Sequence, residues 1–257
     1  MESSSERPLS CELRSQRSCG RRPTSARTDC GRRWTAIRST ESRCAIETFE
    51  QARWIDAWRR VGATPPQDLH VQLIGRYSEP HRAYHTLRHL AECFAALDQT
   101  THLAERSAEV ELALWFHDAI YDTRASDCEE QSARWAEQAL TASGADAAIA
   151  QRVTDLILLT KHSGIPVGVD ARLLIDIDLS ILAATAERFA EYELQVRQEY
   201  DWVPEAAFRQ ARKRILASFR ERPCVYGTPW FAERFEARAR ENLARSLRAL
   251  DAPSNDP

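Results

Sequence analysis

The sequence has no long hydrophobic run and little glycine or proline. No stretch approaches the ~18 consecutive apolar residues of a membrane-spanning helix, so we expect a soluble protein with no membrane segment. With 8 Gly and 11 Pro in 257 residues, the chain is neither collagen-like nor of low complexity. Because 35 Lys+Arg nearly balance 38 Asp+Glu, the net charge of −3 gives no general attraction to nucleic acid or to an anionic membrane.

Cysteine is too sparse and too scattered for a disulfide framework. Four of the seven lie in the first 44 residues, at spacings unlike those of zinc-ligand pairs: Cys11, Cys19, Cys30 and Cys44. The other three are isolated from one another: Cys93, Cys128 and Cys224. This usage favours a reducing compartment, and we expect a cytoplasmic protein.

Residues 1–44 differ in composition from the rest of the chain. They contain ten Arg and five acidic residues, whereas the rest carries 25 basic and 33 acidic side chains. The segment has few large apolar residues, so it cannot offset its ordering entropy, and we predict that it is disordered. An organelle transit peptide has a similar Arg- and Ser-rich composition, but a non-functional extension is the interpretation we favour. A short disordered tail is expected over 251–257.

The segment 45–250 is predicted to be a single all-α domain. Apolar residues recur there at three- and four-residue steps, and the two-residue alternation of strands is absent. Residues 110–120 are apolar nearly all round, which indicates a central buried helix. We assign Trp54, Trp58, Trp115 and Phe116 to the core. Other helices are expected over 84–98, 127–142, 145–160, 185–201, 204–220 and 229–250, with Thr185 and Thr228 as N-caps.

Histidines and acids occur together in apolar surroundings at several points of this domain. His85 and His89 are one helical turn apart, and His117-Asp118 lies within the central helix. Two further pairs follow, Lys161-His162 and the acids Asp176 and Asp178. Helical bundles build metal sites by projecting such side chains inward from different helices. Imidazole with carboxylate suits Mn, Fe, Co, Ni, Zn or Mg. His70 and His102 lack such neighbours, and we assign both to the surface.

The order of these residues resembles that of the HD superfamily of metal-dependent phosphohydrolases, whose pattern is His, then His-Asp, then a distant Asp. The similarity is greatest to a branch of predicted bacterial HD phosphohydrolases and covers about residues 47–250. It rests on five ordered motifs: Tyr84-His85 to His89, Trp115-Phe116-His117-Asp118 with Tyr121-Asp122, Glu129-Glu130-Gln131-Ser132-Ala133, Thr160-Lys161-His162, and Asp176 to Leu182.

This resemblance implies an HD-type helical bundle, a divalent metal ion and hydrolysis of a phosphate ester. It makes His85, His117 and Asp118 metal ligands, with either Asp176 or Asp178 as the last; the helical stretch that follows favours Asp178. His162 is a candidate ligand, and His89 is either a ligand or a group that orients one. Asp118 could also orient the attacking water, and Lys161 and Arg88 are candidate phosphate contacts. Glu129 and Glu130 are candidates for a general base or a ribose contact, although a helix N-terminal charge pair is the more ordinary interpretation.

Two functions remain open from the sequence. The first is an enzyme that hydrolyses a small phosphorylated metabolite such as a nucleotide, with no stable nucleic-acid complex. The second is a non-catalytic HD module that binds metal or nucleotide and regulates a partner. A rarer third is an oxygenase with two irons on the same scaffold. The number of metal ions and a homodimeric state are left undecided.

Overall fold

The computed structural model describes residues 50–252, which form α-helices and two short 3-10 turns with no strand in that range. The predicted all-α fold is therefore confirmed. The predicted disordered extension over 1–44 lies outside the described residues, as do residues 253–257 of the predicted tail. Asp251, placed in that tail by prediction, instead ends the last helix.

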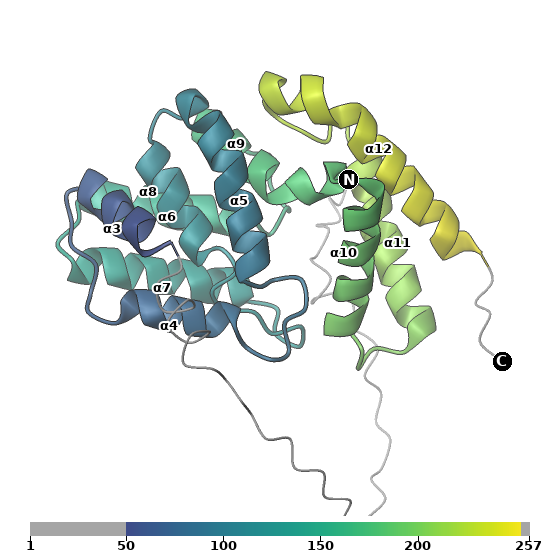
Figure 1. Cartoon of the computed structure of the whole chain (residues 1–257), viewed down its shortest axis with the longest axis horizontal. Coiled ribbons are helices and arrows are strands. Elements are labelled where there is room, and N and C mark those ends of the chain that lie inside the picture. The colour runs from purple at the N-terminus through teal and green to yellow at the C-terminus, as the bar shows by residue number, and fades with distance from the viewer. Residues whose placement is uncertain (1–49, 253–257) are drawn as a thin grey trace, which may run out of the picture.

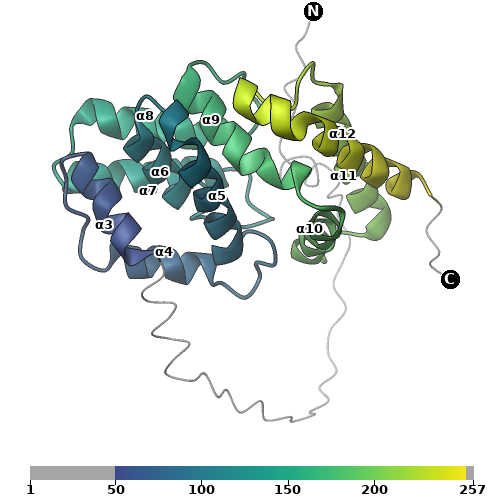
Figure 2. The ribbon, with the colours of Figure 1, turned by 45° about the horizontal axis from the view of Figure 1, so that its top comes forward.

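The helices form two groups (Figure 1). The main bundle contains α3 (Gln51–Arg60), α4 (Leu69–Tyr77), α5 (Leu87–Thr100), η1 (Thr101–Leu103), α6 (Ser107–Phe116), α7 (Cys128–Ala142), α8 (Ala147–Leu159) and α9 (Val169–Asp178). The turn η2 (Leu179–Ala183) leads to the C-terminal helices: α10 (Ala186–Glu199), α11 (Glu205–Glu221) and α12 (Pro229–Asp251). In Figure 2, as in Figure 1, these three lie to one side of the main bundle.

Helix α6 is the centre of the main bundle. It packs against α3, α5, α7, α8 and α9, and all its side chains from Ala108 to Phe116 are buried. A helix that is apolar nearly all round is stable only where neighbours cover every face. The predicted buried helix is thus present, but it ends at Phe116 rather than at residue 120. His117 is its C-cap, and Asp118 lies in the turn beyond.

The aromatic core is the predicted one. Trp54, Trp58, Trp115 and Phe116 are at most 2% exposed, and the rings of Trp54 and Trp115 meet edge to face at 5.1 Å. His70 was expected at the surface, and this was wrong. His70 is only 7% exposed, because its position in α4 packs its ring against Trp54 and Trp115. His102 is exposed, as predicted.

One buried carboxylate ties the C-terminal helices to the main bundle. Asp176 in α9 accepts hydrogen bonds from the backbone N–H of Gly227 and of Thr228, each at 2.7 Å, and from the Thr228 hydroxyl at 2.6 Å. The Thr228 hydroxyl therefore serves Asp176 instead of capping α12. Thr185, in contrast, caps α10 by accepting from the backbone N–H of Arg188. Asp176 has a structural role at this junction.

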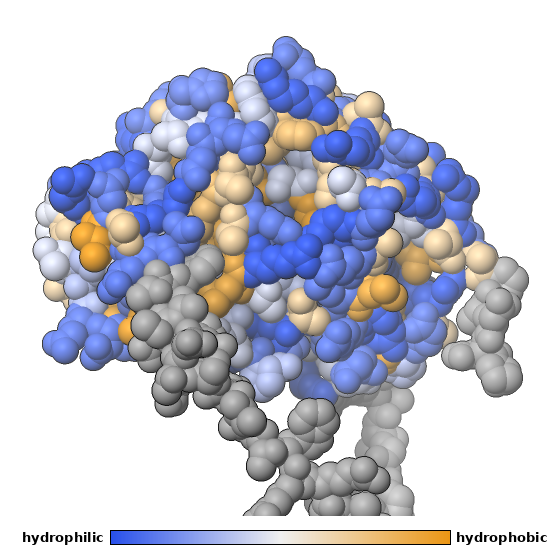
Figure 3. Space-filling view, in the orientation of Figure 1, coloured by the Kyte–Doolittle hydropathy of each residue, from blue (hydrophilic) through white to orange (hydrophobic). Residues whose placement is uncertain are grey.

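The surface in Figure 3 is mostly hydrophilic, with hydrophobic side chains in separate patches. Within residues 50–252, none of the helices combines the length and the apolar character needed to cross a bilayer.

Candidate metal centre

Four side chains from three parts of the main bundle converge on one point. His89 in α5 places its Nε2 3.2 Å from His117 Nε2, 3.5 Å from Asp118 Oδ2 and 3.4 Å from Asp178 Oδ1. His117 Nε2 lies 3.1 Å from Asp118 Oδ2 and 3.7 Å from Asp178 Oδ1. Two imidazole nitrogens and two carboxylate oxygens therefore surround one small volume.

These separations are those of ligands that share a metal ion. Bonds of ~2.1 Å place neighbouring ligand atoms ~3.0 Å apart in octahedral geometry and ~3.4 Å apart in tetrahedral geometry. The observed separations run from 3.1 to 3.7 Å. Nitrogen and carboxylate oxygen together suit borderline-to-hard divalent cations. The residues present thus fit a divalent ion in both spacing and chemistry.

The two imidazoles are held with their Nε2 atoms toward this point. The Nδ1–H of His117 donates to the Leu114 carbonyl oxygen at 2.7 Å, so the neutral ring would carry its lone pair on Nε2, toward the cluster. His89 Nδ1 is 3.0 Å from the Tyr84 hydroxyl. Such partners fix the orientation of metal-binding histidines. Because α6 ends at Phe116, both His117 and Asp118 can face the cluster. In a continued helix, these two successive side chains would point in different directions.

The first histidine of the cluster is His89 and not His85. Helix α5 begins at Leu87 with Thr86 as its N-cap, so His85 precedes the helix and does not share a face with His89. The expected pairing of the two rings on one helical face was therefore wrong. His85 instead stacks on Tyr121 at 4.1 Å between ring centroids and lines a neighbouring cavity.

His85 is positioned by Glu199, a residue that the sequence analysis missed. The Glu199 carboxylate, at the end of α10, accepts from His85 Nδ1 at 2.7 Å and from the Tyr121 hydroxyl at 2.8 Å. It also accepts from the backbone N–H groups of three residues at 2.8 to 3.0 Å: Ala83, Tyr84 and His85. The signal that could have found it is an acid at helical spacing behind Tyr192 and Val196, on the buried face of an amphipathic helix.

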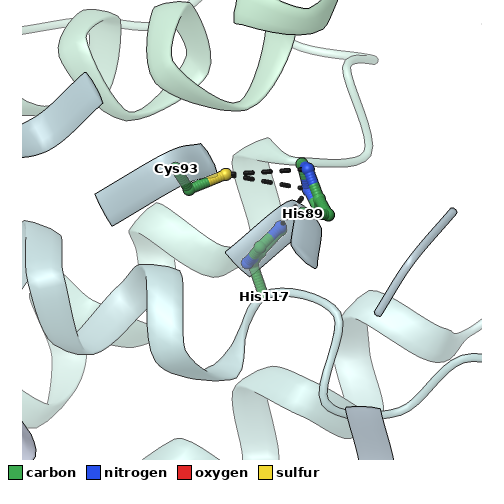
Figure 4. Close-up of side chains that lie close together, drawn as sticks. All are labelled: His89, Cys93 and His117. Carbon is green, nitrogen blue, oxygen red and sulfur yellow. Dashed lines mark hydrogen bonds between the residues drawn. The ribbon is translucent and has the colours of Figure 1, made fainter. Parts of the chain in front are cut away.

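A cysteine lies beside the two histidines. His89, Cys93 and His117 form a buried group close enough to hold a metal ion (Figure 4). Cys93 Sγ, however, is almost equally far from His89 Nδ1 and Nε2, at 3.8 and 3.7 Å. A cation on the in-plane lone pair of Nε2 lies well away from such a sulfur, beyond the ~2.3 Å of a zinc–thiolate bond. Burial, with Asp178 and Asp118 nearby, also raises the pKa of the Cys93 thiol.

The cluster concentrates negative charge in a buried place. Burial alone lowers the pKa of His117, but Asp118 and Asp178 raise it to about 9. Burial raises the pKa of Asp118, yet His117 and His85 bring it well below its usual range. Asp178 behaves in the same way, because His162 and His89 outweigh its burial and keep its pKa low. Two ionised carboxylates thus stabilise the protonated form of His117, a role that a divalent cation would take over on binding.

His162, a candidate ligand from the sequence, lies at the edge of the cluster. Its Nε2 is 3.2 Å from Asp178 Oδ2, the oxygen that faces away from His89, and its Nδ1 is buried without a partner. The residue follows α8 with a φ of 55°, in the left-handed region that non-glycine residues rarely adopt. Strain of this kind persists only where the surroundings hold it, commonly at binding sites.

The remaining predicted residues divide between the site and the rest of the fold. Asp178, favoured over Asp176, is the acid in the cluster, since Asp176 holds the start of α12. Arg88, a predicted phosphate contact, lies outside the cavity: its side chain is half exposed and pairs with Glu191 and Glu92, so this prediction was wrong. Arg88 is at an exposed position in the first turn of α5, which explains why its side chain does not reach the cavity.

The Lys161 and Glu130 side chains form an ion pair. Lys161 lines the cavity, whereas Glu130, a candidate for the general base, does not, because its carboxylate turns to Lys161. Its neighbour Glu129 lines the cavity instead and has a buried Oε2 without a hydrogen-bond partner. Burial raises the pKa of Glu129, and Asp118 adds to the rise.

A cavity of about 210 Å³ opens from the cluster toward the C-terminal helices. His117, Asp118 and Asp178 line one part of it together with His85 and His162. Residues of η2, α10 and α11 also line it. The site can therefore hold a small molecule against the candidate metal ligands.

Comparison with known proteins leaves the site to be interpreted from its own geometry. The chain matches no protein-family model, no curated protein and no solved structure.

Proposed function

We propose that this protein is a metal-dependent phosphohydrolase that cleaves a phosphate ester of a small metabolite such as a nucleotide. The observation that carries the proposal is the convergence of His89, His117, Asp118 and Asp178 beside a small cavity that the last three line. The resemblance to the HD superfamily supports it, with His89 replacing His85 as the first histidine of the pattern. Phosphoester hydrolysis is the chemistry that such a donor set serves in that superfamily.

A divalent cation held by these four residues would lower the pKa of a bound water and withdraw charge from phosphorus. The other requirements fall to the chain itself. Lys161 lines the cavity and can compensate charge on the phosphoryl oxygens. Asp118, kept ionised, can orient the attacking water through its second oxygen. Glu129, whose pKa burial raises, can carry a proton to the leaving oxygen.

The test is phosphate release by the full-length protein loaded in turn with Mn²⁺, Fe²⁺, Co²⁺, Ni²⁺, Zn²⁺ and Mg²⁺. We expect release from an aryl phosphate and from members of a nucleotide and phosphoester library. His117→Ala should lose both bound metal and activity, by a factor of more than about 1000 for activity. His102→Ala removes an exposed histidine and is the matched control, which should behave as the wild type.

Two outcomes would contradict the proposal. If His117→Ala kept its metal and its activity, hydrolysis would not depend on this cluster. If the wild type bound metal and was stabilised by nucleotides without releasing phosphate from any ester, the protein would be a binding module that regulates a partner. A redox-active pair of irons would instead favour an oxygenase.

A further inference from the structure

The cavity has two chemically different ends. All the carboxylates that line it belong to the main bundle: Asp118, Asp122, Glu129 and Asp178. Among the described lining residues from η2 onward there is no carboxylate, but there are two guanidinium groups, Arg212 and Arg222. The carboxylate end therefore favours cations, and the Arg212 end favours anions. Arg222 instead lies beside the cluster, because its Nη2 is 3.4 Å from the His162 carbonyl oxygen.

Between these ends the wall is apolar. Ile181 and Leu182 of η2 and Val196 of α10 line it, and Ile215 and Phe219 of α11 complete it. Arg212, Ile215 and Phe219 follow one another at three- and four-residue steps, so they share one face of α11. A ligand that spans the cavity thus meets a metal-binding end, an apolar middle and a cationic end.

Arg212 is the unusual residue at the cationic end. It is 4% exposed, pairs with Glu193 through Nη2, and lies with its guanidinium 5.0 Å from the centre of the Tyr192 ring. Its Nε–H is buried without a hydrogen-bond partner. A buried donor is normally satisfied, and a ligand oxygen in the cavity that Arg212 lines would satisfy this one.

We infer that Arg212 binds an anionic oxygen group on the organic part of the substrate. The natural substrate is then a phosphate ester of a small, largely apolar acid, with its phosphate at the metal cluster and its second anionic group at Arg212. The part of this inference that concerns the phosphate rests on the proposed function, whereas the Arg212 subsite does not. A cavity of about 210 Å³ is below the ~300–1,000 Å³ of drug-sized sites, which limits the organic part to one ring or a short chain and narrows the phosphate esters of the proposed function to ones smaller than a nucleotide.

The subsite can be tested by binding alone. Benzoate, phenylphosphonate and benzyl alcohol share a ring and differ in the attached group, so titration calorimetry with full-length protein, before and after chelation of metal, isolates the anionic oxygen. We expect one of the two anions to bind at least about tenfold more tightly than benzyl alcohol. The tighter anion distinguishes a carboxylate from a second phosphoryl group as the natural partner.

The variant Arg212→Lys keeps the charge and the pairing with Glu193 but lacks the Nε donor, and it should lose this preference. Arg220→Lys makes the same change at an exposed position of α11 and should retain it. If Arg212→Lys does not fold, Phe219→Leu offers a second measurement, because a smaller apolar wall should weaken all three probes together. Equal binding of alcohol and anions by the wild type, or an unchanged preference in Arg212→Lys, would overturn the inference.

The two proposals fail separately. Anion binding that depends on Arg212, with no phosphate released from any ester, would leave the subsite in place and reject the hydrolase. Hydrolysis without any preference for an anionic organic part would leave the hydrolase and reject the subsite.

Discussion

The main bundle and the C-terminal helices contribute different chemistry to one cavity. The main bundle supplies three of the cluster residues, His117, Asp118 and Asp178, and every lining carboxylate. The C-terminal helices supply an apolar wall with Arg212 and Arg222. In the proposed function, the first group would supply the reaction chemistry and the second would select the organic part of the substrate.

The largest expected effect is on metal binding, and it should differ between variants of His89 and of His85. His89→Ala removes a nitrogen from the centre of the cluster and should weaken metal binding by more than about 100-fold, beyond the loss typical of groups that only orient a ligand. His85→Ala should keep the metal and lower hydrolysis instead, because its ring lies in the cavity wall. Metal titration against a competing chelator measures both. The opposite ranking would return His85 to the ligand set.

The sequence predicted the cluster motifs but not which histidine of the first motif belongs to it. His85 and His89 have the spacing of one helical turn, yet the helix start at Leu87 decides which ring faces inward. That start depends on the Thr86 cap and on Glu199, which lies more than 110 positions away in the chain and holds the 83–85 backbone. Local periodicity contains no information about such a distant partner.

The helices themselves were largely predictable, because their hydrophobic stripes are local. The expected segments over 127–142, 145–160, 185–201, 204–220 and 229–250 are α7, α8, α10, α11 and α12. The burial of α6 could be predicted from its composition alone, but the residue at which it ends could not. In the sequence, Arg88 and Lys161 are both cations next to motifs. The packing shows that Lys161 lines the cavity and Arg88 does not.

Glu199 is a second point, besides Asp176, where the C-terminal helices are tied to the main bundle, so Glu199→Gln tests the division between the two groups. Burial raises its pKa, but His85 and the backbone N–H donors outweigh burial and lower it from 4.5 to about 2. A lowered pKa stabilises the fold above pH 4.5, and this contribution is lost as the pH falls toward 2. The difference between the two values corresponds to about 3 kcal/mol.

We therefore expect Glu199→Gln to lower the free energy of unfolding by about 3 kcal/mol at pH 7, and by progressively less below pH 4.5. Urea unfolding of chelated protein across this pH range measures it. Glu241→Gln, at an exposed position of α12, is the control and should change stability little. A loss for Glu199→Gln that is independent of pH would show that packing, and not the ionised carboxylate, holds the 83–85 segment.

A smaller effect should distinguish the two cations assigned to phosphate from the sequence. Lys161→Gln removes a charge that lines the cavity and should lower kcat/KM by about tenfold or more. Arg88→Gln removes a half-exposed charge that pairs with Glu191 and Glu92, so kcat/KM should stay within about twofold. Steady-state phosphate release compares them. Equal losses of kcat/KM in both variants would show that the substrate also depends on Arg88, outside the cavity.

The smallest effect should come from Cys93, although it lies against both histidines of the cluster. Its Sγ is nearly equidistant from the two ring nitrogens of His89, so it does not share the in-plane position that a cation on Nε2 would take. Cys93→Ser should then change the affinity for Zn²⁺ or Mn²⁺ by less than about threefold. With Co²⁺ bound, the wild type should show no thiolate-to-metal charge-transfer absorption. Such absorption in the wild type, together with its loss in Cys93→Ser, would show that the metal is bound by the Cys93 sulfur in place of the carboxylates.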